Sequence, residues 1–141
     1  MKKFSFRLEK VLKMRAWSEG EARNNLGRAV GELSSIEQAI AENVLARGAA
    51  AAERWTEFNT LNMMRYENYL KRLDDEKDDL KTKAAEAELK VEASRTAWMQ
   101  AKADLKTLET LKDRRHHEYR QELLADEEKQ ISEIRGSATA Y

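Results

Sequence analysis

Apolar residues recur at alternating spacings of four and three along the middle of the chain. The positions are Tyr66, Leu70, Leu73, Lys77, Leu80, Ala84, Ala87, Val91, Ser94, Trp98, Ala101, Leu105 and Leu108, of which only Lys77 and Ser94 break the apolar run. This is the a/d pattern of a coiled coil, and mostly charged residues fill the positions between. Because a helix with one narrow apolar stripe cannot bury that stripe alone, it needs a partner helix.

A second, rougher stripe predicts another helix over residues 4–58. Its members are Leu12, Leu26, Val30, Leu33, Ile40, Val44, Ala51 and Phe58, flanked by Ala22, Ala29 and Ile36 and interrupted by Glu19, Arg23, Glu37 and Arg47. Gly27 and Gly31 lie inside this stripe, and each costs up to about 1 kcal/mol relative to alanine. We expect this helix to be the looser one.

The chain between the two stripes predicts a turn near residues 59–60. Asn59 and Thr60 belong to a cluster of turn and cap residues, and Thr60 suits an N-cap; Gly48 is the competing position. A turn there makes the second stripe the partner of the first. Residues whose numbers add up to about 119 then face each other, which places Leu105 opposite Met14.

The sequence therefore predicts an all-α fold, in which two long helices form one antiparallel coiled-coil hairpin over residues 1–141. We expect the helices to span about 4–58 and 61–135, with a flexible tail at 136–141. The second helix overhangs the first at its carboxyl end. Its apolar residues there (Tyr119, Leu123, Leu124, Ile131 and Ile134) fit either a fraying tail or a surface that orders on a partner.

Composition agrees with long helices and excludes several function classes. Charged residues make up 37% of the chain and aromatic residues 7%, and proline is absent. The 26 basic and 26 acidic residues cancel, so we expect no bulk attraction to nucleic acid. Apolar runs fall short of the roughly 20 residues that span a bilayer. A cytoplasmic protein is the default expectation.

No residue pattern here predicts catalysis, a cofactor or a metal site. His116 and His117 are adjacent, and neighbours on a helix point about 100° apart, so they cannot share a metal ion. We find no phosphate-binding loop and no nucleophile motif. We therefore expect a protein that is not an enzyme.

Two charged stretches remain. Residues 1–15 hold six basic residues against Glu9, interleaved with apolar ones. This segment either closes the base of the hairpin or docks on an acidic partner or a membrane surface. Residues 74–79 are mostly acidic, which fits a solvated face, and Tyr69 beside them is either a partner contact or packs across the hairpin.

Two motifs resemble the FliJ family of the bacterial flagellar export apparatus. The first is Phe4-x-Phe6-Arg7-Leu8-Glu9-Lys10-Val11-Leu12-x-x-Arg15, similar to the amino-terminal signature of that family. The second is Leu108-Glu109-x-Leu111-Lys112-Asp113-Arg114-x-x-x-Glu118-Tyr119, followed by an acidic run to Ile134. The resemblance covers essentially the whole chain.

The resemblance implies a non-enzymatic coiled coil, similar to the stalk subunit of rotary ATPases, at the cytoplasmic face of the inner membrane. Its implied partners are the hexameric export ATPase FliI, FliH, the export gate protein FlhA and the export chaperones. The protein alone is expected to be monomeric. The residues implied to bind the ATPase are Phe4, Phe6, Arg7, Leu8, Leu111, Arg114, Arg115, Tyr119 and Leu123. Those implied to bind the export gate are Tyr69, Leu73, Glu76 and Leu80.

Three other interpretations stay open. The protein could be a chaperone escort that acts outside the ATPase ring through the stretch from Tyr66 to Leu80. It could be a purely structural coiled coil that dimerises, which hydrodynamic measurements would distinguish from a monomeric hairpin. It could also be the related stalk protein of a virulence-type secretion system.

Overall fold

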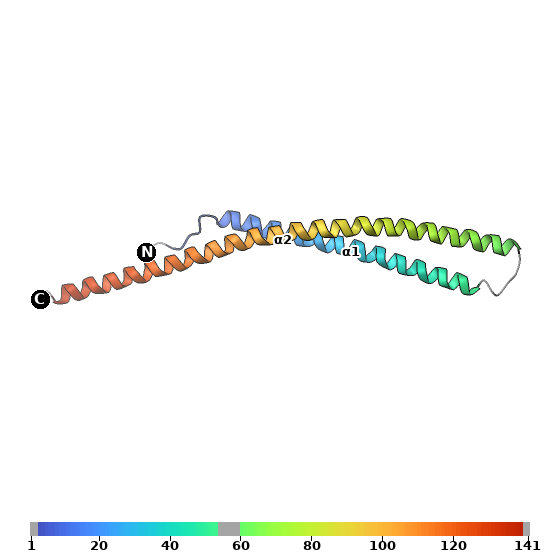
Figure 1. The fold of residues 1–141 in the computed structure, drawn as a ribbon. Helices are drawn as coiled ribbons and strands as arrows, with labels where there is room; N and C mark the ends of the chain where they lie inside the picture. Colours follow the sequence, from blue (N-terminus) through green and yellow to red (C-terminus); the bar gives the residue numbers. More distant parts are fainter. Residues whose placement is uncertain (1–2, 54–59, 140–141) are drawn as a thin grey trace. The chain divides into compact units, whose positions relative to one another are not determined.

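The chain is described here by a computed structural model, which places residues 3–53 and 60–139. These residues form two helices, α1 (Glu9–Glu53) and α2 (Thr60–Thr139), which pack against each other (Figure 1). No strand occurs within the placed residues. The predicted all-α helical hairpin is confirmed.

The start of α1 differs from the prediction. The helix begins at Glu9 and not near residue 4, and residues 3–6 have no regular structure. Phe4, Phe6 and Leu8 are half-buried, whereas the residues between them are exposed. This alternation has the period of an extended chain, in which every second side chain points to the same side. Residues 3–6 therefore direct Phe4 and Phe6 to one side, and residues 7 and 8 form a turn into α1, in which the Glu9 backbone N–H donates a hydrogen bond to the Phe6 carbonyl at 3.1 Å.

The other predicted helix ends lie only partly within the described residues. The predicted turn at Asn59, and the predicted last residues of the first helix, lie outside the described residues. α2 begins at Thr60. It continues to Thr139 and does not end near 135, because the one glycine there, Gly136, costs the helix only about 1 kcal/mol. The described part of the predicted flexible tail is thus helical.

The chain divides into two compact units. One consists of Met1–Gly20 with Met99–Tyr141, and the other of Glu21–Trp98. In the first unit Arg15 pairs with Asp104, at 3.4 Å between Nη1 and Oδ2. This pair satisfies the predicted register. Met14, however, is 68% exposed, so the predicted facing of Met14 and Leu105 is wrong.

The same antiparallel register holds inside the second unit. The Asn43 side chain of α1 reaches Glu76 of α2, at 3.5 Å between Nδ2 and Oε2. Arg47 pairs with Asp74 one turn farther along, at 2.8 Å between Nε and Oδ1. Residue numbers therefore rise along α1 as they fall along α2.

The predicted apolar seam of α2 is confirmed along its whole length. Every seam position from Tyr66 to Leu108 is buried or half-buried, and among the residues between them only Asp104 is not exposed. Leu73, Ala87 and Val91 are the buried members.

The seam predicted for α1 is wrong at three positions. Val30 and Val44 are 46% and 48% exposed, and Ala51 is exposed as well. The neighbouring positions Ala29, Asn43 and Ala50 are buried instead. The residues that face α2 recur along α1 at alternating spacings of three and four. These spacings fall on the small or polar residues Ala29, Asn43 and Ala50 and not on the larger valines.

Candidate functional site

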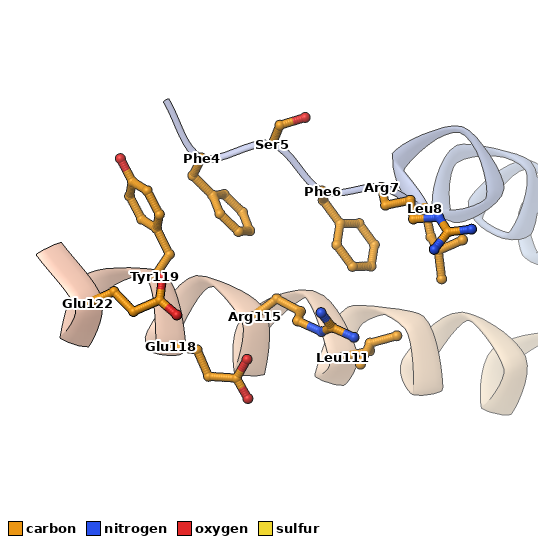
Figure 2. Close-up of a pocket in the computed structure, with 10 residues that line it drawn as sticks. All are labelled: Phe4, Ser5, Phe6, Arg7, Leu8, Leu111, Arg115, Glu118, Tyr119 and Glu122. Atoms are coloured by element: carbon orange, nitrogen blue, oxygen red, sulfur yellow. The ribbon is translucent and has the colours of Figure 1, made fainter. Parts of the chain in front are cut away.

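The extended amino-terminal segment lies along α2. Figure 2 shows the rings of Phe4 and Phe6 pointing toward that helix, whereas Ser5 points away from it. The Phe4 ring stands edge-on to His116 of α2, with ring centroids 4.9 Å apart, and lies 5.5 Å from the ring of Tyr119. Edge-to-face packing of this kind stabilises a contact between aromatic rings, so it fixes the segment against the helix.

A groove of about 370 Å³ opens between this segment and α2 (Figure 2). It is lined by Phe4, Ser5, Phe6, Arg7, Leu8, Leu111, Arg115, Glu118, Tyr119 and Glu122. Its apolar lining comes from both sides, and two arginines and two glutamates border it. Such a groove suits one protruding apolar side chain of a protein partner, held in place by charged neighbours.

We refer to this feature as the base groove. The sequence resemblance implied nine residues for ATPase binding. Seven of them line the base groove, and the other two, Arg114 and Leu123, do not. Arg114 lines a separate hollow with Lys106 and Thr110. Its neighbour Arg115 points about 100° away around the helix and lines the base groove instead. Leu123 is half-buried and does not line the groove.

Two ion pairs join α1 to α2 beside the groove. Lys112 Nζ lies 2.9 Å from Glu9 Oε2, and the Arg15–Asp104 pair follows on α1. All four side chains are partly exposed, so each pair contributes at most about 1 kcal/mol. Their main effect is on the alignment of the two helices.

The four residues implied for the export gate differ in their accessibility. Tyr69 is exposed, and the Arg72 guanidinium lies 5.7 Å from its ring centroid. Leu80 is half-buried and Glu76 is exposed. Leu73, in contrast, is only 7% exposed, because it packs between the helices. Leu73 can therefore influence a partner mainly through the shape of the hairpin.

A polar cluster lies next to these residues. Asn43 is 4% exposed, and its Nδ2 donates a hydrogen bond to the backbone carbonyl of Leu73 at 3.0 Å. The Arg47 guanidinium donates hydrogen bonds to the carboxylate of Asp74. These hydrogen bonds and the positive charge of Arg47 lower the pKa of Asp74, and the same hydrogen bonds and the negative charge of Asp74 raise the pKa of Arg47. The cluster ties α1 to α2 by polar contacts beside the buried side chain of Leu73.

Comparison with known proteins identifies the family. The family model described as Flagellar FliJ protein matches residues 4–139. The chain belongs to the FliJ family. This family is a component of the flagellar export apparatus. No curated protein and no solved structure matches the chain.

The base groove of this FliJ-family chain also contains residues that the sequence interpretation missed. Ser5, Glu118 and Glu122 line it. Leu111, Arg115, Glu118 and Glu122 follow spacings of four, three and four, which place them on one helix face. That spacing was the signal available in the sequence.

Within residues 3–53 and 60–139, no group of three or more histidine, cysteine, aspartate or glutamate side chains is arranged to hold a metal ion. No helix in the same part of this FliJ-family chain is long and apolar enough to cross a membrane.

Proposed function

We propose that this FliJ-family protein is a non-enzymatic, stalk-like component that binds the hexameric export ATPase FliI through the base groove. The observation that carries the proposal is the gathering of Phe4, Phe6, Leu111, Arg115 and Tyr119 around one groove. These residues are far apart in sequence and come from two segments. Partly exposed aromatic and arginine side chains at one place are typical of the residues that dominate binding energy.

A stalk acts on a ring by contacting its subunits differently as their states change. Binding then stabilises one subunit conformation over another by the difference in contact free energy. The base groove offers cations, anions and apolar surface within one small area. Subunits that present different side chains to it would therefore bind with different affinities, and this supports a coupling role.

The second part of the proposal concerns the export gate. We place the contact with FlhA at Tyr69, Glu76 and Leu80, with Leu73 supporting them from between the helices. FliH and the export chaperones are further proposed partners, and the cytoplasmic face of the inner membrane is the proposed location. The exposed Tyr69 ring supports this contact, because exposed tyrosines are frequent at protein interfaces.

The test is the hydrolysis rate of the FliI hexamer, titrated with this protein. We expect stimulation by the full chain, and a concentration for half-maximal stimulation raised about tenfold or more by Arg115→Glu or Phe6→Ala. Arg114→Glu is the matched control, because it changes the charge equally outside the base groove. Stimulation that is identical for the Arg115 and Arg114 variants would place the contact elsewhere.

A further inference from the structure

The first turns of α1 carry two large apolar side chains that point into solvent. Trp17 is 69% exposed and Met14 is 68% exposed, and Lys10 and Lys13 are exposed as well. The four positions follow helical spacings of three and four, so they lie on one face of α1. We call these four residues the outer face. Trp17 and Met14 together form a small exposed apolar patch, which the two lysines border with positive charge.

The outer face is turned away from α2. Leu12 is half-buried against α2, and Glu9 and Arg15 reach α2 through their ion pairs. Lys10, Met14 and Trp17 lie roughly opposite these positions on the helix. In the described part of the chain, no ion pair is found for Lys10 or Lys13. Their charges are therefore available to a partner.

We propose that the outer face binds the anionic surface of a lipid bilayer. Tryptophan prefers the boundary between lipid head groups and acyl chains, and methionine adds apolar area beside it. The two lysines lie on the same face, where they would meet anionic head groups. Lys3 and Arg7 add exposed positive charge in the segment before α1. Clusters of about four cations near an apolar anchor suit weak, salt-dependent membrane binding.

The extent of the outer face favours a bilayer over an acidic protein. A stable protein interface buries roughly 800 Å² on each partner, which four side chains on two helical turns do not supply. The next outward positions, Glu21 and Asn24, are polar and exposed, so the apolar surface ends at Trp17. Membrane binding has no such minimum area, because each inserted side chain and each cation adds its own contribution.

The four residues of the outer face are distinct from those of the base groove, and only Arg7, which adds charge nearby, also lines that groove. The test is flotation of the full chain with vesicles of phosphatidylcholine, with and without about one-third phosphatidylglycerol, at roughly 0.1 M salt. We expect the protein to float only with the anionic vesicles. Trp17→Ala, and separately the double variant Lys10→Glu/Lys13→Glu, should each lower the bound fraction about tenfold.

The matched control is Lys81→Glu/Lys83→Glu, which makes the same change in net charge at exposed positions of the other unit. If the control variant still binds anionic vesicles, the result supports binding through the outer face. An equal loss in both double variants would mean attraction by overall charge and would overturn the proposal. Equal binding to neutral vesicles, or no binding to either kind, would also overturn it. Helical content by circular dichroism should stay unchanged in every variant, since all these side chains are exposed.

Discussion

The side-chain amide of Asn43 donates a hydrogen bond across the helix interface to the backbone carbonyl of Leu73, with 3.0 Å between Nδ2 and O. Asn43 occupies a seam position of α1 and is buried. Its Oδ1 is also buried and has no hydrogen-bond partner. A buried acceptor without a partner costs stability, whereas a buried asparagine in a coiled coil selects one register and one oligomeric state.

Replacing Asn43 should therefore increase the stability of the fold while weakening its preference for one oligomeric state. We expect Asn43→Leu to raise the free energy of unfolding by about 1–3 kcal/mol, because the unsatisfied oxygen is removed and apolar area is added. The same variant should form mixed oligomers, which sedimentation equilibrium would detect. Val44→Leu, at the exposed neighbouring position, should leave both properties unchanged. A less stable, strictly monomeric Asn43→Leu variant would contradict this account.

The Arg47–Asp74 pair makes stability depend on pH. Because the pKa of Asp74 is lower in the folded chain than its ordinary value of 3.8, the pair stabilises the fold above that value. The contribution is lost as the pH falls through the lowered pKa, where Asp74 takes up a proton. Both side chains are half-exposed, so the effect is small.

Asp74→Asn should lower the melting temperature at pH 7 by about one or two degrees. The difference from the parent chain should shrink below about pH 4 and vanish at lower pH. Asp75→Asn is the control, since Asp75 is the neighbouring carboxylate and is exposed. A difference between the Asp74 variant and the parent that persisted in strong acid would assign the loss to something other than the ion pair.

The glycines of α1 offer a stabilising change. A Cβ atom added at Gly27 or Gly31 would have no other atom within 4 Å, so neither glycine serves close packing. Gly27→Ala and Gly31→Ala should each raise the free energy of unfolding by about 0.5–1 kcal/mol, because alanine loses less backbone entropy in a helix. Urea denaturation would measure this. The gains should add in the double variant, and a net loss would reveal a contact at these positions.

Periodicity predicted most of the fold, and its failures have definite causes. The seam of α2 could be read position by position because its spacing is regular and its members are mostly apolar. In α1 large valines beside the seam drew the interpretation away from Asn43 and Ala50, which are polar or small but buried, whereas Ala29 was included as a flanking position. Spacing alone would have found them. Residues 4–8 were predicted to be helical because a period of two over so few residues is a weak signal.

The candidate site was predicted through family resemblance, and its geometry was not. Resemblance supplied Phe4, Phe6 and Arg115, and the structure brings them to one groove. It could not distinguish Arg114 from Arg115, because a motif states order along the chain and not direction around a helix. Glu118 belonged to the quoted motif, but only its place on the same helix face as Leu111 and Arg115 ties it to the groove.

Loss of the contact between Phe4 and α2 should affect only the amino-terminal segment. Phe4→Ala removes its edge-on packing with His116 and its contact with Tyr119, which is worth about 0.5–1.5 kcal/mol beyond the buried area. The extended segment should then detach, whereas α1 and α2 stay paired through their own seam. We expect faster amide hydrogen exchange over residues 3–8, a changed chemical shift of the His116 ring protons, and a melting temperature within about one degree of the parent chain.

Ser5→Ala is the control, because Ser5 is exposed and points away from α2 (Figure 2). Unchanged His116 shifts in the Phe4 variant would mean that the segment does not lie on α2 in solution.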